Sequence, residues 1–163
     1  MHGHQYPRCS EQLRTLRERR GLTSTELAGR IGLPVPWFRD LEAYDDEMYG
    51  NVSLAHLQRL ALLLGVSVAQ LLMVDPSQAS GQRISFAHVV DRLRDTLAAS
   101  GESAEAFGAR VGWEVDRALG VPDDCWGWCP EELQDIAVGL GINWVAALPE
   151  PLDAPPRETG TGA

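Results

Sequence analysis

The sequence predicts an all-α protein made of two tandem five-helix modules. Apolar residues recur at helical spacing through most of the 163 residues, and no stretch shows the strict alternation of a half-buried strand. Glycines and capping residues separate these apolar runs. Hydrophobic residues make up 44% of the chain and charged residues 23%, so the chain can bury a core.

The first three helices are marked by their ends. The first is expected from about residue 9 to residue 20, and it stops at Gly21. The segment 23–26 has the form of a capping box and starts the second helix, which ends near Gly32. Pro36 suits the first turn of a third helix, because an amide hydrogen there would have no partner within the helix.

An acidic loop is expected after the third helix, through Gly50. Asn51 or Ser53 then caps a fourth helix, which has leucines at helical spacing up to Leu64. A short fifth helix is expected to end near Leu72. These five helices make up the first module.

The second half of the chain repeats this plan. Identical residues recur at an offset of 80 residues and then at an offset of 76, on turns as well as on apolar positions. The first set is Leu13, Arg14, Gly21, Arg30 and Gly32 with Leu93, Arg94, Gly101, Arg110 and Gly112. The second set is Leu57, Gln58, Ala61, Leu64, Gly65 and Leu72 with Leu133, Gln134, Ala137, Leu140, Gly141 and Leu148. The alternative is a chance overlap between two leucine-rich and glycine-rich helical sequences.

The repeat predicts the domain organisation. We expect a first module at 8–74, a linker at 75–83 and a second module at 84–149. Residues 150–163 are rich in proline and are expected to form a disordered tail.

Three motifs of the first half occur together in one known family. Residues 22–28 read Leu-Thr-x-x-Glu-Leu-Ala, residues 32–33 read Gly-Leu, and residues 54–66 read Leu-x-x-Leu-x-x-Leu-Ala-x-x-Leu-Gly-Val. Residues 13–72 therefore resemble the lambda-repressor-like (XRE) helix-turn-helix family, and residues 89–149 resemble a degenerate copy of it. The resemblance implies that both modules are helix-turn-helix-like. It also implies that the third helix of the first module enters the major groove of DNA.

The resemblance also implies an internal ion pair. In this family an arginine of the first helix pairs with a glutamate at the end of the third, and Arg17 and Glu42 occupy these positions. The second half has Leu97 and Pro122 instead, so it lacks both partners. Joint loss is consistent with electrostatics, because one remaining buried charge would cost about 3–5 kcal/mol.

Few residues of the expected reading helix suit base recognition. Arg39 is its one side chain of the type that pairs with purine edges, and Val35 or Trp37 would contact a thymine methyl group. Ser24 and Thr25 lie at a helix N-terminus, where backbone amides hold phosphates. These five residues are the candidate DNA contacts.

The third helix of the second half is expected at 113–119 and is not expected to read DNA. It offers only Arg117, which is preceded by Glu114 and Asp116. The whole chain has 14 basic residues, all arginine, against 23 acidic ones, for a net charge of -9. Because cationic side chains drive binding to phosphates, this balance excludes a non-specific nucleic-acid coat protein.

Each half also has an acidic, aromatic loop at the corresponding place. Tryptophan and tyrosine are enriched in protein interfaces, so these loops are expected to bind a protein partner. The alternatives are that the aromatic rings fill the core and that the carboxylates are merely solvated. The candidate interaction residues are Asp45, Asp46, Tyr49, Asp123, Asp124, Trp126 and Trp128.

The sequence shows no pattern typical of an enzyme or a metal site. The three cysteines and four histidines lack zinc-ligand spacing, and no phosphate loop or catalytic constellation is present. The longest apolar stretch, 60–74, is too short to span a bilayer. We therefore expect a cytoplasmic protein with reduced thiols that has no cofactor and is not an enzyme.

Two functions of different classes follow. The first is an XRE-type DNA-binding transcriptional regulator that reads DNA with its first module, has a second, non-reading helical domain, and forms a homodimer as such regulators generally do. The second is an adaptor, antitoxin-like or assembly protein that retains the fold but has lost DNA reading. The acidic segment 34–51, with five carboxylates and one arginine, favours the second.

Overall fold

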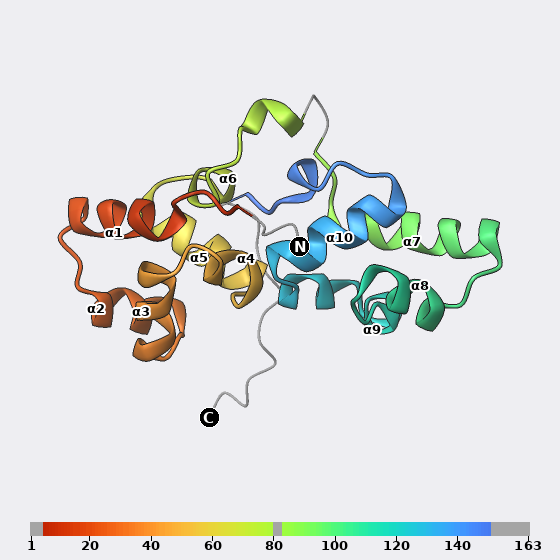
Figure 1. Cartoon of the computed structure of the whole chain (residues 1–163), viewed down its shortest axis with the longest axis horizontal. Coiled ribbons are helices and arrows are strands. Elements are labelled where there is room, and N and C mark those ends of the chain that lie inside the picture. Colours follow the sequence, from red (N-terminus) through yellow and green to blue (C-terminus); the bar gives the residue numbers. More distant parts are fainter. Residues whose placement is uncertain (1–4, 80–82, 151–163) are drawn as a thin grey trace.

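The computed structural model describes residues 5–79 and 83–150, and this part of the chain contains helices and no strand (Figure 1). The predicted all-α class is confirmed. The predicted tail begins at residue 150, and from residue 151 onward it lies outside the described residues. No helix within the described ranges has the length and apolar character needed to cross a bilayer.

The first half has the predicted helices with nearly the predicted ends. Thr23 caps α2 by accepting a hydrogen bond from the Glu26 amide, and Ser53 caps α5 in the same way. Gly32 ends α2 in the left-handed conformation at φ 78°, which a side chain would strain. The helices are α1 (Cys9–Arg19), α2 (Ser24–Ile31), α3 (Val35–Ala43), α4 (Glu47–Gly50), α5 (Leu54–Leu64) and α6 (Val68–Leu71).

One helix was not predicted. The sequence predicts a loop through Gly50, whereas Glu47–Gly50 form α4. An isolated helix of this length is unstable in water, so contacts with the rest of the protein must hold it. Met48 and Tyr49 supply them, because both side chains are buried.

The second half follows the same order of elements. It consists of α7 (Phe86–Ser100), α8 (Ala104–Val111), α9 (Asp116–Gly120), the 3-10 helix η2 (Pro122–Gly127), α10 (Pro130–Leu140) and η3 (Val145–Ala147). A further 3-10 helix, η1 (Pro76–Ala79), lies within the predicted linker. The prediction of a third helix at 113–119 was wrong in its bounds. The Trp113 amide instead donates to the Gly108 carbonyl, and Val115 is buried, so this segment packs across α8 before α9 begins.

The predicted repeat has support from local structure. Residues 101–110 have the same order of buried, half-buried and exposed positions as residues 21–30. The turn after α2 closes with a hydrogen bond from the Leu33 amide to the Ala28 carbonyl, at 3.0 Å. The Trp113 amide makes the corresponding bond after α8, also at 3.0 Å. The tandem arrangement remains a prediction that these matching turns favour.

The two halves pack against each other through corresponding elements. Helix α4 contacts α10, and η2 contacts α5, as two copies related by a twofold axis would do. The Leu54 amide donates to the Trp128 carbonyl at 2.8 Å. The residue that corresponds to Leu54 is Pro130, which has no amide hydrogen, so this bond has no counterpart.

The N-terminal segment strengthens the same contact. The Tyr6 hydroxyl donates to the Glu131 carboxylate of α10, and its ring lies 5.3 Å from that of Tyr49. This hydrogen bond is the main cause that raises the pKa of Tyr6 to about 12. The buried apolar residues form one core that includes residues of both halves. Helices α2 and α3 lie at one end of a long side of the molecule, and α8 and α9 lie at its other end (Figure 1).

Candidate nucleic-acid interface

Helices α2 and α3 form the predicted helix-turn-helix. Their inner faces are fixed by fully buried side chains of Leu27, Ile31 and Phe38. Gly32 allows the tight turn between them, and Pro34 precedes the first residue of α3. Burial on one side leaves the opposite side of α3 facing solvent.

The candidate DNA contacts lie at the surface of this unit. Thr25 and Arg39 are exposed, whereas Ser24 and Val35 are half-buried. Trp37 keeps 61% of its surface exposed, which is unusual for a large apolar side chain. Thr25, Trp37 and Arg39 therefore lie on the outer side of two adjacent helices, whereas Val35 also packs against the core.

The Arg17–Glu42 pair holds this unit to α1. Nε of Arg17 donates to Oε1 of Glu42 at 2.5 Å, and Nη2 donates to Oε2 at 3.0 Å. A third bond joins Nη1 to the Leu22 carbonyl at 2.8 Å, just before α2. The side chains of Arg17 and Glu42 are only 13% and 11% exposed, so both lie largely inside the protein and not at its surface. Hydrogen bonding to Glu42 is the largest cause that raises the pKa of Arg17, which is therefore charged.

Some residues expected at a protein-binding surface are instead internal. Tyr49 is 6% exposed and Trp128 is 4% exposed. The Tyr49 hydroxyl donates to the Leu72 carbonyl, and the Trp128 carbonyl accepts from Leu54 of the other half. Asp45 also has an internal task, because it accepts hydrogen bonds from the amide and the hydroxyl of Ser10 at the start of α1. These loops do form an interface, but one within the chain.

The remaining candidates of the acidic loops lie nearer to solvent. Asp46 and Asp123 are exposed. Asp124 pairs with Arg117, and the half-buried ring of Trp126 packs edge-on against Phe86 with centroids 4.9 Å apart. Asp123 and Trp126 line one pocket, and Asp124 and Trp128 line another.

The outer side of α9 is acidic and short. Glu114 and Asp116 are exposed beside Arg117, and α9 has five residues where α3 has nine. This arrangement is consistent with the prediction that the second half does not read DNA.

The thiols are buried and unpaired. Burial raises the pKa of Cys9 and Cys125 to about 12 and that of Cys129 to about 11. A high pKa disfavours the thiolate, which is the form that binds metals and attacks electrophiles. Within the described ranges, no three histidine, cysteine or acidic residues are grouped as metal ligands.

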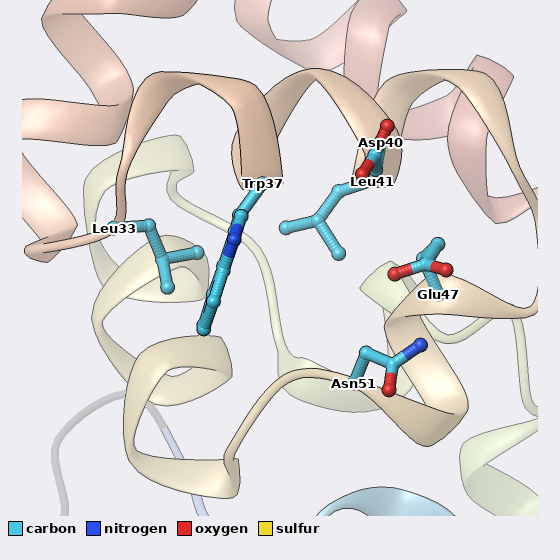
Figure 2. Close-up of a pocket in the computed structure, with 6 residues that line it drawn as sticks. All are labelled: Leu33, Trp37, Asp40, Leu41, Glu47 and Asn51. Atoms are coloured by element: carbon cyan, nitrogen blue, oxygen red, sulfur yellow. The ribbon is translucent and has the colours of Figure 1, made fainter.

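A pocket beside α3 contains residues that the sequence analysis did not select. Glu47 and Asn51 line it together with Asp40 and Trp37 (Figure 2). Glu47 and Asn51 are four residues apart, which is one helical turn, whereas the sequence predicts a loop in this segment. The missed α4 therefore explains the missed pocket.

The comparison with family models agrees with this geometry. Residues 10–72 match the family described as "Helix-turn-helix domain". No curated protein and no solved structure matches the chain. The first half is a helix-turn-helix domain, and the match ends before the second half begins.

Proposed function

We propose that the chain is an XRE-type transcriptional regulator, located in the cytoplasm, that binds DNA through its first half. The observation that carries this proposal is the helix-turn-helix match over residues 10–72, whose α3 is exposed to solvent. In such domains the second helix of the motif lies in the major groove. The second half serves as a non-reading helical domain.

The candidate residues would contact different parts of the DNA, the phosphates and the base edges. The backbone amides of Ser24 and Thr25 at the start of α2 would hold a phosphate, because the first amides of a helix have no acceptor within it; the Thr23 side chain caps the next amide, that of Glu26. Arg39 would read a guanine edge, and either Val35 or Trp37 would contact a thymine methyl group. Two sequence-reading side chains at most support only modest specificity.

Fluorescence anisotropy tests this proposal. The purified chain is titrated with a duplex from its own upstream region and with a random duplex, at about 50 and about 200 mM salt. We expect tighter binding to the upstream duplex and a steep loss of affinity at the higher salt concentration. The proposal is wrong if neither duplex binds at either salt concentration.

A pair of arginine variants then locates the reading helix. Arg39→Ala should relax specificity and cost about 1–3 kcal/mol of binding free energy. Arg117→Ala is the matched control, since Arg117 lies on α9 in the second half. Equal losses from both variants would contradict the assignment of reading to the first half alone.

The second candidate function is a protein-interaction module, of the adaptor or antitoxin-like kind. Its supporting observation is the carboxylate of Asp40 next to the exposed Trp37 on α3. A carboxylate there would face the phosphates of bound DNA, which is unfavourable. Absence of DNA binding in the titration above would favour this candidate.

A further inference from the structure

The pocket beside α3 has a defined lining and size. It is lined by Leu33, Trp37, Asp40, Leu41, Glu47 and Asn51, and its volume is about 210 Å³. We call it the α3 pocket. Sites for drug-sized ligands have volumes of about 300–1,000 Å³, so the α3 pocket suits a single long side chain better than a whole metabolite.

The lining combines an aromatic face with two carboxylates. The indole plane of Trp37 stands between Leu33 and Leu41, and Glu47 and Asn51 lie across from it (Figure 2). Among the described residues, the side chains of Asp40 and Glu47 form no ion pair or hydrogen bond. An indole face attracts a cation through its quadrupole, and nearby carboxylates add Coulombic attraction.

The second half has a pocket at the corresponding place, with a cation in it. With the predicted repeat offsets, Trp113 matches Leu33, Arg117 matches Trp37, and Gly127 matches Asn51. All three residues line that second pocket, together with Asp124. Nη2 of Arg117 lies 3.4 Å from Oδ1 of Asp124. The second half therefore places an arginine beside one of the three carboxylates that line its pocket, Glu114, Asp124 and Glu132, whereas the first half has tryptophan at that position.

We propose that the α3 pocket binds the arginine side chain of a partner protein. The guanidinium group would stack on the Trp37 indole and pair with the carboxylates of Asp40 and Glu47. Arginine fits better than lysine, because its planar group stacks on aromatic rings and bonds carboxylates at two points. A partner held there covers the outer side of α3, so it competes with any DNA bound by the same helix.

Nuclear magnetic resonance of the full chain tests this inference without DNA. The signal is the indole N–H of Trp37, assigned by its loss in Trp37→Phe. The probes are two blocked tripeptides, acetyl-Gly-Arg-Gly-amide and acetyl-Gly-citrulline-Gly-amide, which have the same shape but differ in charge. We expect the arginine peptide to shift this signal in a saturable way, and the citrulline peptide to bind at least tenfold more weakly.

Two matched double variants locate the site. Asp40→Asn with Glu47→Gln should weaken binding of the arginine peptide at least tenfold. Glu114→Gln with Asp116→Asn removes the same charge from exposed residues of the second half and should leave the affinity unchanged. The rest of the spectrum reports whether each variant is folded.

Three results would overturn the inference. Equal binding of both peptides would show that charge is not recognised. Equal affinity of the wild type and the Asp40, Glu47 variant would place any binding elsewhere. Tighter binding of agmatine, a free guanidinium amine, than of the peptide would indicate a small-molecule cation instead of a protein partner. None of these results depends on whether the chain binds DNA, so the regulator proposal is tested separately.

Discussion

Removing one partner of the Arg17–Glu42 pair should destabilise the protein more than removing both. Arg17→Met keeps the apolar stem but leaves the Glu42 carboxylate in a site where it is 11% exposed. Glu42→Leu leaves the arginine, which is 13% exposed. Breaking a buried pair costs about 3–5 kcal/mol, and this slight exposure favours the lower end, about 3 kcal/mol for each variant. The double variant leaves no uncompensated charge, so it should cost about 1 kcal/mol.

Urea denaturation at pH 7 measures these differences as free energies of unfolding. For a chain of this size, a loss of about 3 kcal/mol corresponds to a melting temperature lower by roughly 6–12 °C. The double variant should melt above both single variants. If its loss equals the sum of the two single losses, the side chains act independently, and the reasoning from an uncompensated charge is refuted. The second half, with Leu97 and Pro122, already lacks both partners.

Three further outcomes follow from packing and burial. Gly108→Ala should lower the stability by about 1–3 kcal/mol, because the added Cβ would lie 2.5 Å from the Trp113 carbonyl oxygen. Gly29→Ala is the matched control: its Cβ meets nothing within 4 Å, so thermal melts should show a stability gain of about 0.5–1 kcal/mol. Trp128→Ala should cost about 3–5 kcal/mol, because Trp128 is only 4% exposed, while Trp37→Ala, at a residue that is 61% exposed, should change stability by less than about 0.5 kcal/mol; similar losses would contradict the internal position of Trp128. The free energy of unfolding should also fall as the pH rises above 9.0, the ordinary pKa of a thiol, because the unfolded thiols ionise there while the folded ones stay protonated up to pH 11–12. A variant with all three cysteines replaced by serine should lose this pH dependence. A wild-type stability that does not change above pH 9.0 would contradict the prediction. The residues concerned are Cys9, Cys125 and Cys129.

The sequence predicted the elements whose ends have local causes. Thr23 and Ser53 cap their helices through their own side chains, and Gly32 is left-handed where the periodic pattern stops. Such signals are contained in a few neighbouring residues. The helical class and the helix ends could therefore be predicted from local signals, whereas the helix-turn-helix and the Arg17–Glu42 contact followed from the family resemblance.

What the sequence did not predict depends on contacts between the halves. Helix α4 is held by the burial of Met48 and Tyr49, and it also contacts α10 some eighty residues away. Trp128 was expected at a surface because tryptophan is common in interfaces, and the interface turned out to be internal. Aromatic composition indicates an interface without saying which partner forms it. The α3 pocket was missed for the same reason, since Glu47 reaches it only from α4.

The pairing of α4 with α10 and of α5 with η2 has a kinetic and thermodynamic consequence. Two separate subunits joined in this way would come apart on dilution, whereas a covalent connection fixes their effective concentration whatever the amount of protein. With the predicted tandem repeat, each chain would contain both members of this pairing at any abundance. A response that depends on this pairing should rise in simple proportion to the number of chains, without the threshold that dimer assembly imposes.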